Sequence, residues 1–106
     1  MPTSYRLSRR ALKELRTVCS YIAYDSQTAA VRVERAILGA CELLAQNPKI
    51  GSERRHVTSL PVLFWTVTKF PNYQIVYRPE TSPLQIVAIL HGKQNLDIAL
   101  KRTKRP

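Results

Sequence analysis

The sequence predicts a single α+β domain, in which a short N-terminal strand and an α-helical hairpin precede and pack on an antiparallel β-sheet, in the order β-α-α-β-β-β. Two amphipathic helical patterns occupy the first half of the chain, and alternating or β-branched segments occupy the second half. The 106 residues, of which 44% are hydrophobic, suit one core and leave no room for a second. We assign residues 1–95 to this domain and expect residues 96–106 to form a short helix or a basic flexible tail.

The first helix is predicted from Ser8 to about Tyr24. Residues 4–7 alternate between polar and apolar side chains, which is typical of a brief strand. Ser8 then stands where an N-cap is expected, because its hydroxyl can accept a hydrogen bond from an amide of the next turn. Apolar residues follow at three- and four-residue spacing and give the helix one apolar face: Leu12, Leu15, Val18, Cys19 and Ile22.

A second helix is predicted after residues 25–28, whose side chains favour turns and caps. Asn47-Pro48 ends it, because a proline disfavours helical geometry in the residue before it. Two helices joined by a short turn form an αα-hairpin, which needs a sheet to cover its apolar side. The second apolar stripe consists of Val33, Ile37, Ala40, Cys41 and Leu44.

Three strands are predicted in the second half, after an exposed loop over residues 48–60. Residues 62–68 are rich in β-branched and aromatic side chains, and residues 73–78 alternate strictly. Residues 84–90 are almost continuously apolar, which is typical of a strand covered on both faces. The last strand is therefore predicted to be central.

The chain is strongly basic, with 17 Lys and Arg residues against 7 Asp and Glu residues and a formal charge of +10. The excess lies mainly in residues 1–16 and 101–106. Such a charge favours an acidic partner, namely nucleic acid, an acidic protein segment or a membrane surface, and the alternative is a solvated surface that keeps the protein soluble. No membrane span or signal-peptide core is apparent, so we expect a cytoplasmic protein.

The two cysteines, Cys19 and Cys41, fall among apolar neighbours within the helical patterns. No second cysteine stands close enough to either to build a metal or redox motif, so we expect buried reduced thiols, with a disulfide between the helices as the alternative. We expect neither a metal nor a cofactor.

Few residues of the sequence are candidates for catalysis or for binding a ligand or partner. His91, at the end of the last predicted strand, could act as a general acid or base, or could simply hydrogen-bond a loop, and His56 is the other histidine. Trp65 could be a core anchor or an exposed contact for a partner. Tyr73 and Tyr77 share a strand face, where they could stack bases or line the sheet. Four basic residues could converge on an anion or be separate surface charges: Arg54, Arg55, Arg78 and Lys93.

Three short motifs, in this order of elements, make the chain similar to the RelE/ParE toxin superfamily of type II toxin–antitoxin systems. They are Asn47-Pro48-Lys49-Ile50-Gly51, residues 73–78 (Tyr-Gln-Ile-Val-Tyr-Arg) and Ile89-Leu90-His91-Gly92. The resemblance extends from Tyr5 to about Asn95. It implies the predicted fold, and it implies a cognate antitoxin that is acidic where it wraps the toxin.

The resemblance favours the ParE-like branch. RelE-like toxins cleave messenger RNA on the ribosome with a set of basic residues, and this sequence departs from that set: residues 62–68 contain no lysine, Gln74 follows Tyr73, and Gln94 follows Lys93. Without those cations the phosphorane formed during cleavage would lack its charge stabilisation. Some ribonuclease relatives use a histidine near the position of His91, so that residue is the catalytic candidate of the alternative.

The ParE-like branch implies a toxin that binds DNA gyrase and traps it on cleaved DNA, thereby inhibiting by binding rather than by catalysis. The alternatives are a ribosome-dependent messenger RNA endonuclease centred on His91, and a non-toxic domain that binds operator DNA only in complex with its antitoxin. We expect the antitoxin to lie across the helical hairpin and the sheet edge, and the candidate contacts are Leu12, Leu15 and Trp65.

Overall fold

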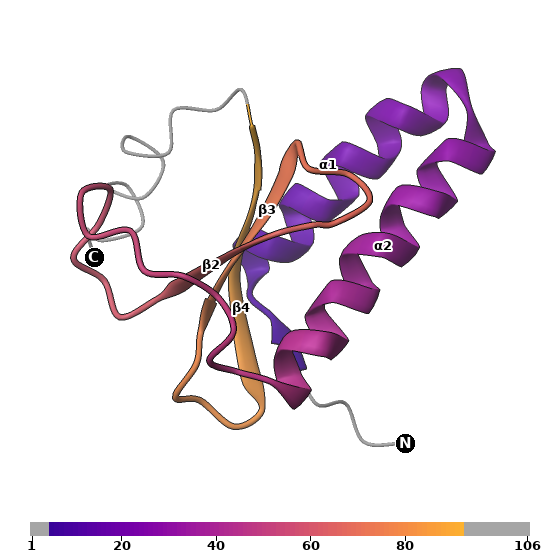
Figure 1. Cartoon of the computed structure of the whole chain (residues 1–106). Coiled ribbons are helices and arrows are strands. Elements are labelled where there is room, and N and C mark those ends of the chain that lie inside the picture. The colour runs from indigo at the N-terminus through magenta and orange to yellow at the C-terminus, as the bar shows by residue number, and fades with distance from the viewer. Residues whose placement is uncertain (1–4, 93–106) are drawn as a thin grey trace.

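The computed structural model, shown in Figure 1, describes residues 5–92 and has the predicted order of elements. The predicted helix or basic tail over residues 96–106 and the candidate Lys93 lie outside the described residues. The elements are β1 (Tyr5–Leu7), α1 (Arg9–Asp25), α2 (Gln27–Gln46), β2 (Leu63–Thr66), β3 (Tyr73–Arg78) and β4 (Leu84–His91).

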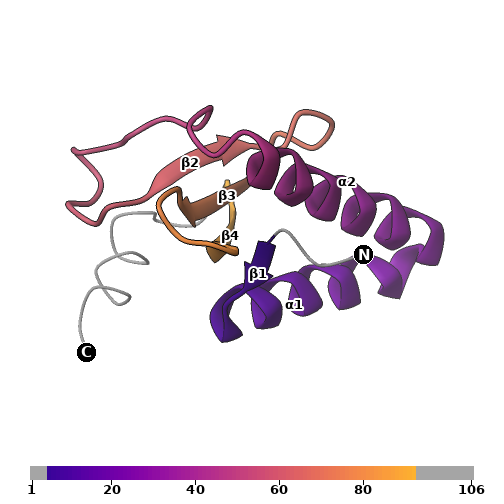
Figure 2. The same ribbon diagram turned by 90° about the horizontal axis from the view of Figure 1, so that it is seen from below.

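The four strands form one sheet in the order β1-β4-β3-β2, which confirms that the last strand is central. The pairs β2–β3 and β3–β4 are antiparallel, as predicted. β1 pairs with β4 in the parallel sense, so the complete sheet is mixed rather than purely antiparallel. Figures 1 and 2 show both helices on the same side of the sheet.

A single residue, Ser26, separates the two helices, whereas the sequence predicted an interruption over residues 25–28. Its backbone is extended, its N–H donates to the carbonyl of Ile22, and its hydroxyl accepts from the N–H of Ala29 at 3.1 Å. Ser26 therefore ends one helix and begins the next. Ser8 caps α1 as predicted, because its hydroxyl accepts from the N–H of Ala11 at 2.9 Å.

The helices cover one face of the sheet and form the main core with it. Ala11 and Leu15 of α1 join this cluster with four residues of α2, namely Val33, Ile37, Cys41 and Leu44. The sheet contributes Ile75 and Tyr77 of β3 together with Leu84, Ile86 and Ile89 of β4. Burying this apolar surface is the dominant favourable term for the domain.

A second cluster, on the opposite face of the sheet, explains why the sequence of β4 is almost continuously apolar. Phe64, Val76, Ala88 and Leu90 are buried there, and Val57 and Leu60 of the 48–60 loop pack against them. The loop is also tied to the sheet, because Ser52 and Phe64 exchange two backbone hydrogen bonds of 2.8 and 2.9 Å. The prediction of an exposed loop was therefore wrong for Val57 and Leu60, and β4 is buried on both faces as predicted.

The two thiols are free and are predicted to differ in reactivity. Burial raises the pKa of Cys41 from 9.0 to about 12, whereas Cys19 is half-buried and burial raises its pKa as well. Because the thiolate is the nucleophile, we expect slow modification of Cys19 by a thiol reagent in the native protein, and modification of Cys41 only after unfolding. Counting modified thiols with and without urea tests this, with Cys19→Ala as the control; native labelling of Cys41 at the rate of Cys19 would contradict it.

Candidate functional site

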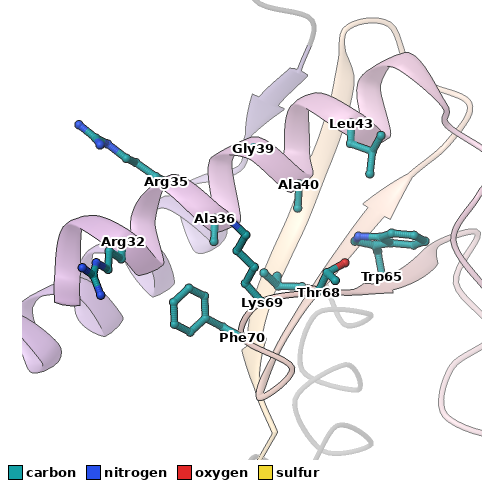
Figure 3. Close-up of a pocket in the computed structure, with 11 residues that line it drawn as sticks. Arg32, Arg35, Ala36, Gly39, Ala40, Leu43, Trp65, Thr68, Lys69 and Phe70 are labelled. Atoms are coloured by element: carbon teal, nitrogen blue, oxygen red, sulfur yellow. The ribbon is translucent and has the colours of Figure 1, made fainter. Parts of the chain in front are cut away.

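Two grooves flank the helical layer, and the first lies between α2 and the segment that follows β2. We call it the α2 groove; its volume is about 580 Å³. Figure 3 shows Lys69 and Phe70 reaching from that segment toward α2, with Leu43 beside Trp65 at the other end. Its lining residues are Arg32, Arg35, Ala36, Gly39, Ala40 and Leu43 of α2, and Trp65, Val67, Thr68, Lys69 and Phe70.

The α2 groove combines an apolar floor with a basic rim. On α2, Ala36, Gly39 and Ala40 are small, and a Cβ atom added at Gly39 would have no neighbour within 4 Å. Among residues 5–92, three cations, Arg32, Arg35 and Lys69, line the groove and no carboxylate does. A glycine inside a helix costs about 1 kcal/mol of stability relative to alanine, so Gly39 lowers the stability of α2.

Trp65 of β2 lies at one end of the α2 groove and is both a core residue and a groove residue. Its ring is partly buried and packs against the main core cluster. The indole Nε1 atom is buried and has no hydrogen-bond partner among the described residues. An unsatisfied buried donor costs about 1–3 kcal/mol, so the position of this N–H group is unfavourable for the isolated chain.

The second groove, which we call the His91 groove, lies between α1 and the ends of β3 and β4 and has a volume of about 610 Å³. The rings of His91 and Tyr73 pack edge to face, with centroids 5.2 Å apart. Glu14 of α1 accepts from the N–H of Ile89 at 2.9 Å and pairs with Arg10 at 3.2 Å. The remaining lining residues are Lys13, Thr17, Val18, Tyr21 and Ile22.

Comparison with known families identifies the chain. Residues 5–96 match the family described as the ParE toxin of the type II toxin-antitoxin system, parDE. The chain belongs to the ParE toxin family. A comparison with curated proteins found no significant match. Family membership makes this chain a type II toxin, and it implies an antitoxin partner.

In this ParE-family chain the three candidate anion-binding residues that the structure describes do not gather around His91. His91 pairs with Tyr73 at one end of β3, and Arg78 lies at the other end, about 17 Å away at the rise of a strand. Arg54 and Arg55 line a surface hollow with Pro79 and Glu80, which directly follow Arg78. Three of the predicted cations therefore lie at the end of the sheet opposite to His91.

Two of those cations, Arg54 and Arg55, already have interactions within the ParE-family fold. The Arg54 guanidinium lies over the ring of Phe64, 5.3 Å from its centroid. Arg55 pairs with Glu53 at 2.9 Å, and both side chains are largely exposed. Glu53 and Glu80 line the same hollow, so carboxylates accompany the cations there. This arrangement is typical of solvated surface charge.

The candidate antitoxin contacts occupy different environments. Leu12 is half-buried and lines a shallow hollow on the outer face of α1 with Arg9 and Arg16. Leu15 is only 5% exposed and lies in the main core, because the face of α1 that carries it packs on the sheet. Its side chain is therefore not available to a partner. Trp65 lines the α2 groove.

Tyr77 has a structural role that the sequence did not reveal. It is fully buried, which excludes base stacking, and its hydroxyl donates to the carbonyl of Pro48 at 2.7 Å while accepting from the N–H of Gly51 at 2.9 Å.

Among residues 5–92 no helix is long and apolar enough to cross a membrane, and no cluster of three His, Cys, Asp or Glu side chains could hold a metal ion.

Proposed function

We propose that this type II toxin acts in the cytoplasm by binding DNA gyrase and inhibiting it, and that a cognate antitoxin neutralises it. The family match supports the toxin and the antitoxin partner in general terms. The choice of gyrase over messenger RNA rests on one observation, which is the separation of His91 from the predicted cations Arg54, Arg55 and Arg78.

This separation matters because of the chemistry of RNA cleavage. Attack by a 2′-hydroxyl group requires a base near the nucleophile and cations around the charged phosphorane. Among the described residues the His91 groove contains one cation, Lys13, together with the carboxylate of Glu14. A carboxylate in that position would repel a phosphate, which disfavours phosphoryl chemistry in the groove.

The decisive experiment measures both activities with the same purified protein. A DNA supercoiling assay with gyrase is run beside a translation-coupled messenger RNA cleavage assay. We expect loss of supercoiling or accumulation of cleaved DNA while the message stays intact. Cleaved message with normal supercoiling would replace this proposal by the endonuclease alternative. No effect in either assay would favour the third hypothesis, a domain that acts only with its antitoxin on operator DNA.

His91→Ala is expected to leave gyrase inhibition and growth arrest within about twofold of the wild type, because a residue that takes no part in chemistry contributes no transition-state stabilisation. Dose–response curves for supercoiling and growth measure the effect. His56→Ala, which removes the other histidine from an exposed loop position, is the matched control. A loss of about a hundredfold in His91→Ala alone would indicate general acid–base catalysis by His91.

A further inference from the structure

The outer face of α1 carries exposed charges of one sign. Arg9, Lys13 and Arg16 stand four and three positions apart, so their side chains share one face of the helix. Figure 2 shows α1 along one border of the fold. We call this surface, which is a shallow hollow of about 530 Å³, the α1 basic face. Its residues are Arg9, Leu12, Lys13, Arg16, Thr17 and Ser20.

No carboxylate within residues 5–92 neutralises the α1 basic face. Its lining residues include no Asp or Glu, and its three cations make no ion pair with any described residue. Glu14 lies in the same turns of the helix but faces the sheet, where it pairs with Arg10 and accepts from the N–H of Ile89. The positive charge of the face is therefore uncompensated in the described part of the chain.

The α1 basic face also lacks the apolar anchors that a protein partner needs. Interfaces between proteins are held by a few buried apolar or aromatic side chains. Leu12 is the one large apolar residue of the face, and it is half-buried. The α2 groove shares the positive charge but has an apolar floor. The α1 basic face is thus better suited to a polyanion than to a protein segment.

The spacing of the cations fits a phosphate backbone. Residues 9–16 cover about 10 Å of helix axis, and each strand of DNA presents a phosphate about every 3.4 Å of the duplex. Three long cationic side chains can therefore reach about three successive phosphates. Thr17 and Ser20 continue the row with hydroxyl groups, which also donate to phosphate oxygens. A lipid surface fits less well, because the apolar face that an interfacial helix would insert is packed in the core.

We propose that the α1 basic face binds the phosphate backbone of the duplex DNA held by gyrase, so that the toxin contacts the DNA as well as the enzyme. Phosphate contacts carry no sequence information, so this contact is independent of base sequence and weak by itself. It strengthens inhibition because gyrase presents DNA beside the bound toxin, which makes the second contact intramolecular. The assignment rests on the proposed function, since gyrase is the target that brings duplex DNA to the toxin.

The central test is Arg9→Gln with Arg16→Gln, measured by fluorescence anisotropy with a short labelled DNA duplex and without antitoxin. We expect the affinity at low salt to fall by about tenfold to a hundredfold, and the slope of log K against log salt to become shallower by about two. Arg32→Gln with Arg35→Gln removes the same charge from exposed positions of α2 and is the matched control, with a much smaller effect expected.

Folding and binding are separated by the position of Arg9. It lies in the first turn of α1, where a positive charge is unfavourable for the helix, so the melting temperature of the Arg9→Gln, Arg16→Gln variant is expected to equal or exceed that of the wild type. In the gyrase assay this variant is expected to require about tenfold more toxin for the same accumulation of cleaved DNA. Its affinity for the antitoxin is expected to be unchanged.

Four outcomes decide between the partners. Equal DNA affinity of the α1 variant and the wild type, or equal losses in the α1 and α2 variants, would overturn the assignment and leave the toxin function intact. A comparable loss of antitoxin affinity would assign the face to the antitoxin instead. Tighter binding of the wild type to phosphatidylserine vesicles than to the duplex would assign it to a lipid surface. DNA binding through this face without gyrase inhibition would overturn the proposed function alone.

Discussion

Tyr77→Ala is expected to lower the free energy of unfolding by about 4 kcal/mol, which is the typical cost of truncating a buried aromatic side chain. Tyr77 is 0% exposed and packs in the main core with Ile75 and Ile86. The change removes this packing and also leaves the carbonyl of Pro48 and the N–H of Gly51 without their partner. Since small domains are stable by only about 5–15 kcal/mol, much of the total would be lost.

Tyr77→Phe separates the hydroxyl from the ring and is expected to cost about 2 kcal/mol, because the ring stays packed while two buried hydrogen bonds disappear. Gly51→Ala tests the same contact from the other side, since a Cβ atom there would lie 2.5 Å from the Tyr77 hydroxyl. Urea unfolding of the three variants measures these costs. A Tyr77→Phe variant as stable as the wild type would show that the hydroxyl does not hold residues 48–51 on the sheet.

Glu14→Ala is expected to lower the free energy of unfolding by about 2–3 kcal/mol, because hydrogen bonds to a charged group are stronger than average. Glu14 accepts from the N–H of Ile89 on the central strand, and β1 is too short to reach that position, since its pairing with β4 ends at Ile86. The Glu14 carboxylate thus supplies a hydrogen-bond acceptor for β4 beyond the end of β1. Its removal leaves a backbone donor unsatisfied beneath α1.

Two variants divide this effect between its parts. Glu14→Gln keeps an oxygen that can accept from Ile89 and is expected to lose less than half as much stability. Arg10→Ala removes only the ion pair with Glu14 and is expected to cost about 0.5 kcal/mol, which is typical of a partly exposed pair. Urea unfolding followed by circular dichroism measures all three variants. Equal losses in Arg10→Ala and Glu14→Ala would assign the effect to the ion pair instead of the strand contact.

Local patterns in the sequence determined the secondary structure and much of the topology. The three- and four-residue apolar spacing placed α1 and α2, strict alternation placed β3 with its exact bounds, and the nearly continuous apolar run marked β4 as central. Ser8 was recognised as an N-cap because capping depends on neighbours within one helical turn. These features are local, so periodicity and residue type are sufficient to find them.

The candidate sites were predicted less well, because a site depends on residues that are far apart in the sequence. The sequence left open whether the arginines converge on an anion or are separate surface charges, and only the strand register showed that Arg78 and His91 lie at opposite ends of the sheet. Leu15 and Leu12 had the same helical signal, yet only Leu15 faces the core. The α2 groove was missed apart from Trp65, although an unexplained Gly39 inside a helix was a signal that could have drawn attention to it.

The sequence by itself determined a ParE-like α+β domain with a large positive charge, because periodicity, caps, short motifs and composition are properties of neighbouring residues or of the whole chain. Only the tertiary structure decided the parallel pairing of β1, the tether from Tyr77 to Gly51 across 26 positions, and the groove between Gly39 and Trp65. The physical reason is that hydrogen bonds and grooves between distant segments exist only after the shared core has brought those segments together.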